Sequence, residues 1–150
     1  LTHANAEIVN HTLDGDVERR EHWRDIFDSL TRMKKFCEEH GIKFVLSVYP
    51  WAHQISDTEW VPGRYVFMST YAKTTDRSIK TIHKMAAANG IELVDVTPTF
   101  KAYQNLDPMY FSHGPMYFSH DMHWTPVGHR VMARGLEDHL VARLAPTWCR

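Results

Sequence analysis

Apolar side chains recur every three or four residues between positions 17 and 40, which is the spacing of one face of an α-helix. This pattern predicts a helix from Val17 to His40, and Gly41 behind it suits a left-handed helix end. The same spacing predicts helices from Tyr71 to Asn89, with Gly90 behind, and from Thr125 to Leu144. The side chains expected to face inward are Trp23, Ile26, Phe27, Leu30, Met33, Cys37, Ile79, Ile82, Met85, Ala86, Met132, Leu136, Leu140 and Leu144.

Two short and nearly continuous apolar runs lie between these helices. They are Ile42 to Tyr49, stopped by Pro50, and Ile91 to Val96, followed by Pro98. Runs of this length, bounded by glycine and proline, are typical of buried strands. Because helices alternate with strands, we expect an α/β fold with a parallel sheet, and ligands near residues 50–53 and 97–100, beyond the strands. The stretch from Trp51 to Thr70 is predicted to be a long loop.

Composition narrows the class of protein. The chain has 150 residues, 43% hydrophobic and 23% charged, which fits one globular domain over residues 1–150 or the C-terminal part of one. A net charge of -1 gives no basic field, so we expect no nucleic-acid partner. No apolar run approaches the roughly 20 residues of a membrane span. The chain begins with Leu1 and shows no signal peptide, which leaves its compartment open, as well as its oligomeric state.

A short repeat precedes the last helix. The six residues of Pro108–His113 recur as Pro115–His120. Two copies are too few for a solenoid, so we interpret the repeat as a local duplication inside a loop. It lengthens the loop that leads into the segment from Asp121 to His129.

That segment contains an aspartate and a histidine two residues apart, Asp121 and His123. A carboxylate this close can accept a hydrogen bond from one ring nitrogen, which fixes the tautomer and leaves the other nitrogen as a base. Such a base needs a nucleophile from elsewhere in the fold. Asp121 could equally brace the loop, and His123 could be an ordinary surface residue.

The wider segment Asp-Met-His-Trp-Thr-Pro-Val-Gly-His, followed by Ala133 in the terminal helix, resembles the C-terminal block of the SGNH (GDSL-type) hydrolases. The order of helices and strands is similar to that family from about Val17 to Leu144. The resemblance implies a three-layer α/β/α sandwich with a parallel sheet and no cofactor. It also implies acyl-ester hydrolysis, with Asp121 and His123 as the catalytic Asp and His of a Ser-His-Asp triad.

The chain also departs from that family. It has no Gly-Asp-Ser-like block to supply the nucleophile, and the family's oxyanion-hole asparagine corresponds only loosely to Asn5. We interpret Ser47, Ser112 and Ser119 as ordinary polar residues, because none suits the sharp turn of a nucleophile. The chain is therefore expected to lack the N-terminal strands and to be a weak esterase, or none, by itself. In some polysaccharide O-acetyltransferases of the superfamily an Asp-x-His-Trp block precedes the serine, and this alternative remains open.

Two further interpretations concern binding. A metal site is not expected, although histidines crowd this stretch, because their spacing matches no common zinc frame. The aromatic residues near the predicted ligand edge could instead make the chain a non-catalytic module that binds a carbohydrate or a partner. As substrate-binding residues, for a small-molecule or carbohydrate ester, we predict Trp51, His53 and Trp124. Covering the core is the alternative role for these side chains.

Overall fold

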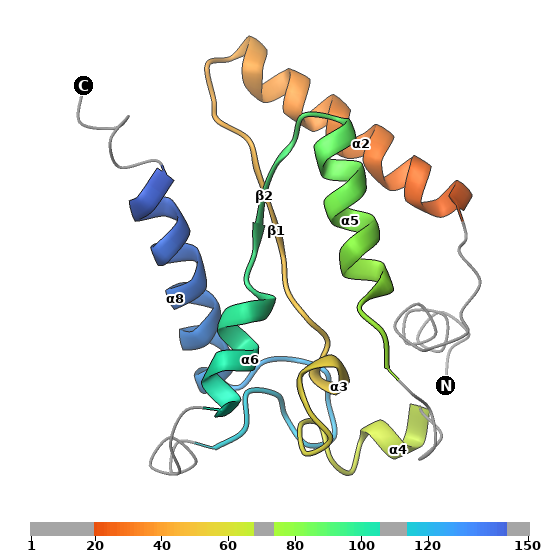
Figure 1. The fold of residues 1–150 in the computed structure, drawn as a ribbon, viewed down its shortest axis with the longest axis vertical. Helices are drawn as coiled ribbons and strands as arrows, with labels where there is room; N and C mark the ends of the chain where they lie inside the picture. The colour runs from red at the N-terminus through yellow and green to blue at the C-terminus, as the bar shows by residue number, and fades with distance from the viewer. Residues whose placement is uncertain (1–19, 68–73, 106–113, 144–150) are drawn as a thin grey trace. The chain divides into compact units, whose positions relative to one another are not determined.

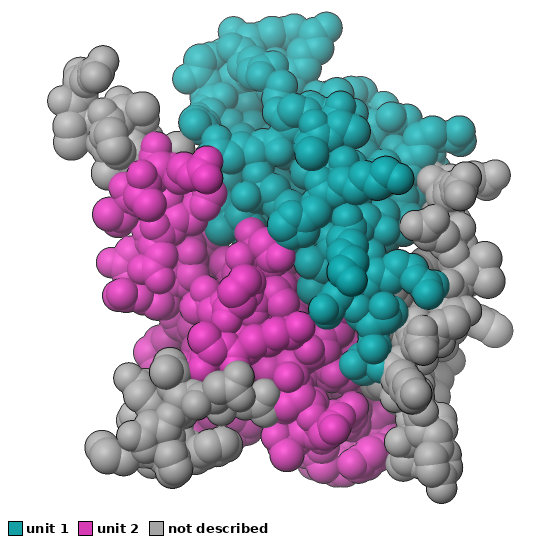
Figure 2. Space-filling model, in the orientation of Figure 1, with its two compact units in different colours: residues 1–48, 73–94 teal, residues 49–72, 95–150 magenta. Residues whose placement is uncertain are grey.

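The computed structural model describes residues 20–67, 74–105 and 114–143 (Figure 1). The chain divides into two compact units, which Figure 2 colours separately. Unit 1 comprises residues 1–48 and 73–94, and unit 2 comprises residues 49–72 and 95–150. Within the described ranges, no helix is long and apolar enough to cross a bilayer.

Unit 1 holds the two predicted strands and the two helices that precede them. Helix α2 spans Arg20–Glu39, strand β1 spans Val45–Val48, helix α5 spans Arg77–Ala88, and strand β2 spans Glu92–Asp95. The strands pair in a small parallel sheet, so the predicted α/β class is confirmed. Both strands are shorter than their apolar runs suggested, because the ends of these runs do not join the strand pairing.

The predicted glycine ends of both helices are confirmed. Gly41 and Gly90 have φ of 68° and 60°. The amide of Ile42 donates to the carbonyl of Cys37 at 2.8 Å, and the amide of Ile91 donates to that of Ala86 at 2.9 Å. These six-residue bonds define the Schellman motif, which turns the chain from each helix into the strand that follows.

The core of unit 1 lies between the helices and the strands, and α2 and α5 occupy the same side of the strand pair in Figure 1. Two side chains predicted to face inward do not: Ile26 and Met33 are 48% and 54% exposed. The buried line of α2 runs through Phe27, and Ile26 lies about 100° away around the helix. The apolar stripe of α2 is thus wider than the side of the helix that is buried in the core of unit 1. The cluster consists of Phe27, Ala86 and Ile91, with Trp23, Leu30, Phe44, Leu46, Ile82, Met85 and Leu93 packed against it.

Within the described residues, unit 2 contains four helices, and the sequence pattern did not predict three of them. The predicted long loop from Trp51 to Thr70 is wrong, because it contains α3 (Ala52–Ile55) and α4 (Arg64–Phe67). Helix α6 (Thr97–Asn105) follows directly on β2, and α8 (Pro126–Arg143) is the predicted last helix. These three new helices are too short to show an apolar period of 3.6.

Helix α6 packs against α8 and α3 to form the centre of unit 2. The face that α8 buries differs from the predicted stripe: it consists of Val127, Gly128, Val131 and Gly135, while Met132, Leu136 and Leu140 are half-buried. Gly135 lies against Val96 so closely that a Cβ there would come within 2.9 Å of its side chain. Glycine thus lets the helix approach Val96, within unit 2. The most deeply buried large side chains of unit 2 are Trp60, Phe100, Met116 and Tyr117.

Candidate active site

Asp121 and His123 lie in a short hairpin of unit 2, which we call the Asp-His loop (residues 117–124). An antiparallel bridge between Tyr117 and Trp124 closes the loop. The amide of Phe118 donates to the carbonyl of His123 at 3.1 Å, inside the bridge. A local backbone framework therefore holds the pair, rather than a long flexible connection.

The two faces of the Asp-His loop differ sharply in exposure. Side chains alternate along paired strands, so Tyr117 and Trp124 share one face and Phe118 and His123 share the other. Tyr117 is 1% exposed and Trp124 is half-buried. Phe118 is 48% exposed, and the side chain of His123 is 86% exposed. One face of the loop thus anchors it, and the other presents an imidazole beside a phenyl ring.

The carboxylate of Asp121 contacts His123 twice. Its Oδ1 accepts the backbone N–H of His123 at 2.7 Å and also bonds the ring Nδ1 of the same residue. The backbone and ring bonds lower the pKa of Asp121 below its ordinary value, so the carboxylate is ionised at neutral pH. Such an acceptor favours the tautomer with the proton on Nδ1, which leaves Nε2 as the basic nitrogen.

Two buried hydrogen bonds fix the inner face of the loop. The hydroxyl of Tyr117 donates to the carbonyl of Pro50, which follows β1. The side chain of Trp124 in turn hydrogen-bonds Tyr117. Burial raises the pKa of Tyr117, which keeps its proton available for donation. The segment of unit 2 that begins near Pro50 is thereby tied to the loop that carries Asp121 and His123.

The predicted cap of the last helix is present. The Oγ1 of Thr125 accepts the amides of Val127 and Gly128 at 3.2 and 3.3 Å, and Pro126 is the first residue of α8. The amide of Thr125 donates to the carbonyl of Met116 at 2.9 Å. The Asp-His loop is therefore continuous with a capped helix on one side.

The predicted substrate-binding residues lie in different surroundings. Trp124 packs by ring contacts on Tyr49 at 4.6 Å and on Phe100 at 6.0 Å. Trp51 is half-buried at the start of α3, and His53 is 2% exposed. That these residues contact a substrate stays a prediction.

The remaining candidate residues from the sequence are Asn5 and three serines. Asn5 and Ser112 fall outside the described residues. The hydroxyl of Ser119 bonds the Nδ1 of His120 at 2.9 Å, and Ser47 lies within β1. Within the part of the chain that the structure describes, no group of three His, Cys, Asp or Glu side chains is arranged to hold a metal ion.

The burial of His53 has a consequence for stability. Burial, aided by the charge of Arg64, lowers the pKa of His53 to about 4 from 6.5. Because the unfolded chain binds this proton first as the pH falls, we expect unit 2 to lose about 3 kcal/mol between pH 6.5 and 4 from this group. Urea unfolding of wild type and of His53→Gln over that range measures it, since the glutamine does not titrate. Parallel stability curves for the two proteins would contradict the expectation.

Sequence reasoning missed two features of the site. Phe118 stands out in the sequence only as part of the repeat, although its alternation with Tyr117 signals that it shares the face of His123. Glu59 bonds the amides of Met116 and Tyr117, 57 and 58 residues further along the chain. No local pattern could have indicated a contact across such a separation.

Comparison with protein families gives a match over most of the chain. The model of the family described as "SGNH hydrolase-like domain, acetyltransferase AlgX" matches residues 9–147, which include the whole Asp-His loop. No curated protein matches the chain, and no solved structure matches it.

Proposed function

Since the chain belongs to the family of SGNH hydrolase-like domains of the acetyltransferase AlgX, we propose that it carries the Asp-His part of a Ser-His-Asp triad for acyl transfer. The observation that supports this most directly is the double contact of Asp121 with His123. It orients an exposed imidazole with Nε2 available, as a general base requires.

In the proposed reaction, Nε2 of His123 takes the proton from a serine hydroxyl while the serine oxygen attacks the acyl carbonyl carbon. The bond to the leaving alcohol then breaks, and Nε2 returns the proton to that alcohol. An acceptor hydroxyl, deprotonated by the same nitrogen, next attacks the acyl-serine; the bond from the acyl carbon to the serine oxygen breaks, and Nε2 passes the proton to that oxygen. Asp121 stabilises the imidazolium in both steps because its carboxylate is ionised. The serine is not identified in this sequence.

The acceptor distinguishes two versions of this chemistry. With a sugar hydroxyl the protein is an O-acetyltransferase, and with water it is an esterase. The description of the family as an acetyltransferase supports the first. The exposed rings of Phe118 and Tyr49, 48% and 46% accessible in unit 2, also support it, since aromatic faces suit the apolar face of a sugar ring. We therefore propose a carbohydrate acceptor and an acetyl ester as donor.

The test is an assay of this chain in a protein that contains the nucleophilic serine, with p-nitrophenyl acetate as donor and an oligosaccharide as acceptor. Asp121→Asn is expected to lower the rate by on the order of 10², because the amide removes the charge and disturbs the ring tautomer. Mass spectrometry of the oligosaccharide, together with acetate release, separates transfer from hydrolysis.

Ser119→Ala is the matched control for this assay. Its hydroxyl bonds His120 rather than His123, so its loss should leave the rate unchanged. A wild-type rate in Asp121→Asn would remove the proposed function. A loss in Ser119→Ala as large as in Asp121→Asn would instead identify Ser119 as the nucleophile.

A further inference from the structure

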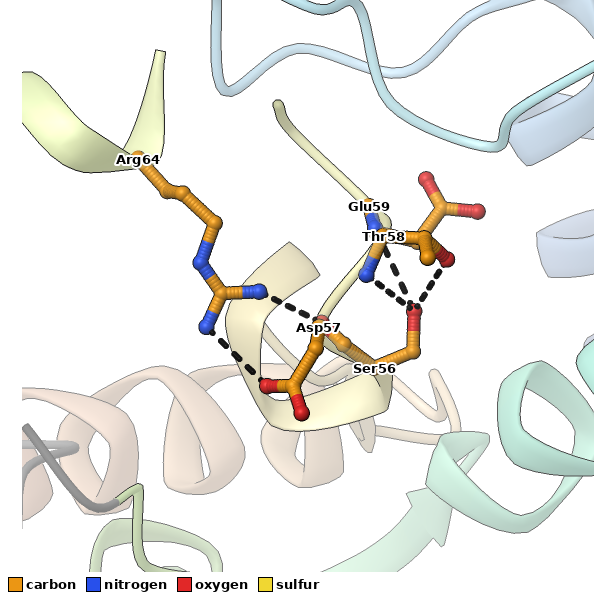
Figure 3. A network of polar contacts seen from close by, with 5 residues as sticks. All are labelled: Ser56, Asp57, Thr58, Glu59 and Arg64. Atoms are coloured by element: carbon orange, nitrogen blue, oxygen red, sulfur yellow. Dashed lines mark hydrogen bonds and ion pairs between the residues drawn. The ribbon is translucent and has the colours of Figure 1, made fainter. Parts of the chain in front are cut away.

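Glu59 lies between α3 and α4 and is 6% exposed, which is unusual for a carboxylate. A buried charge is costly unless hydrogen bonds or an opposite charge compensate for it. Figure 3 shows its side chain pointing away from Arg64. Arg64 instead donates to the carbonyl of Ser56 at 2.8 Å and contacts Asp57 at 3.4 Å. The compensation for Glu59 therefore comes from elsewhere.

The hydrogen bonds that compensate for the burial of Glu59 come from two consecutive backbone amides at the entrance of the Asp-His loop. Oε1 of Glu59 accepts the N–H of Met116 at 3.1 Å, and Oε2 accepts the N–H of Tyr117 at 3.1 Å. The backbone hydrogen bonds of the bridge lie on either side of the Tyr117–Trp124 pair and not between the two residues. The amide of Tyr117 therefore points away from Trp124 and needs another partner. Glu59 is that partner.

The turn that carries Glu59 is itself held in place. The hydroxyl of Ser56 accepts the amides of Thr58 at 3.3 Å and of Glu59 at 3.2 Å (Figure 3). The bond from Arg64 to the carbonyl of Ser56 closes the turn from the other side. A short turn fixed at both ends can hold the carboxylate in one position without a long helix behind it.

A second contact joins the same segment to the Asp-His loop. The amide of Gly63 donates to the carbonyl of Ser119 at 2.8 Å. A Cβ at Gly63 would lie 2.7 Å from that oxygen and 2.5 Å from the indole nitrogen of Trp60, so only glycine permits the approach. The segment from Ser56 to Gly63 thus holds the loop at its entrance and again two residues before Asp121.

We propose that Glu59 is a positioning residue of the site, whose carboxylate holds the amides of Met116 and Tyr117 and thereby fixes the geometry of Asp121 and His123. The inference rests on the proposed function of that pair. A carboxylate suits this task because each of its two oxygens accepts one amide, whereas the glutamine side chain offers one oxygen and a donor.

The free-energy cost of burying the Glu59 carboxyl favours a positioning role for this residue over a stabilising one. Burial raises the pKa of Glu59 despite the opposing effect of its two amide bonds. The folded state therefore holds the ionised carboxylate less favourably than water does. A buried carboxyl group of this kind contributes little to stability for its own sake, and its contacts explain its presence better.

The experiment compares Glu59→Gln and Glu59→Asp with Glu137→Gln in the full chain. Glu137 is an exposed carboxylate of α8 in the same unit and serves as the matched control. In both Glu59 variants we expect the carboxyl of Asp121, followed by NMR, to titrate at higher pH than in wild type, because its bonds to His123 loosen. The amides of Met116 and Tyr117 should exchange with solvent at least about tenfold faster, as expected on losing a hydrogen bond to a charged group. Glu137→Gln should change neither signal.

Two outcomes would overturn the inference. A folded Glu59→Gln protein with the wild-type titration of Asp121 would show that the pair does not depend on Glu59. Unfolding of unit 2 in both variants would show that Glu59 supports the whole unit rather than one loop. Neither measurement uses a substrate, so a failure of the acyl-transfer function would be seen separately, in the p-nitrophenyl acetate assay.

Discussion

Replacing His123 with alanine, in a protein that contains the nucleophilic serine, is expected to lower kcat for acyl transfer by on the order of 10³ or more, as removal of a triad base does. The reason is chemical, because Nε2 handles a proton in both halves of the proposed reaction. The ring is 86% exposed, and its removal leaves the backbone bonds of the Asp-His loop in place. We therefore expect an unchanged free energy of unfolding beside the loss of rate, measured with p-nitrophenyl acetate and by urea unfolding.

His120→Ala is the control for this prediction. His120 is an exposed histidine three residues earlier in the same loop, and its ring bonds Ser119 rather than Asp121. Its replacement should leave kcat unchanged. If His123→Ala retained the wild-type kcat, the imidazole would have no part in the reaction. A chain in which both variants lost activity equally would point to the shape of the loop instead.

Replacing Phe100 with alanine is expected to destabilise unit 2 by about 3–5 kcal/mol, the range for deleting a buried aromatic ring. Phe100 is 0% exposed in α6, and its ring centroid lies 6.3 Å from that of Tyr117 and 6.0 Å from that of Trp124. The cavity would therefore open beneath the anchoring face of the Asp-His loop. Urea unfolding followed by tryptophan fluorescence measures the loss.

Phe118→Ala removes the same ring from an exposed position in the same unit, and should change the free energy of unfolding by less than about 1 kcal/mol. Because both variants remove a phenylalanine ring, the difference between their free energies of unfolding reports the effect of burial and not of residue type. Equal effects for Phe100 and Phe118 would mean that Phe100 is not part of the core of unit 2.

The elements that sequence patterns predicted well are those fixed by local chemistry. Gly41 and Gly90 ended their helices as predicted, because a left-handed residue is a local requirement that glycine meets. Thr125 capped α8 for the same reason, since its hydroxyl bonds amides only two and three residues away. The short helices α3, α4 and α6 escaped prediction because four to nine residues carry too little periodicity.

Burial was harder to predict than helicity. Ile26 and Met33 belong to the apolar pattern of α2 and are nevertheless exposed, because a helix buries only the side that another element covers. In α8 the buried line includes Gly128 and Gly135, which no scale of hydrophobicity would select. They are buried because neighbouring backbone and side chains approach too closely for a Cβ.

The sequence by itself determined the α/β order of helices and strands, the helix ends and the spacing of Asp121 and His123, because each depends on residues a few positions apart. The tertiary structure decided the rest of the site. It brought Glu59 to the entrance of the loop, and it buried Tyr117 while leaving Phe118 and His123 exposed. Contacts between residues more than 50 positions apart depend on how the whole unit packs, and a linear pattern holds no record of that packing.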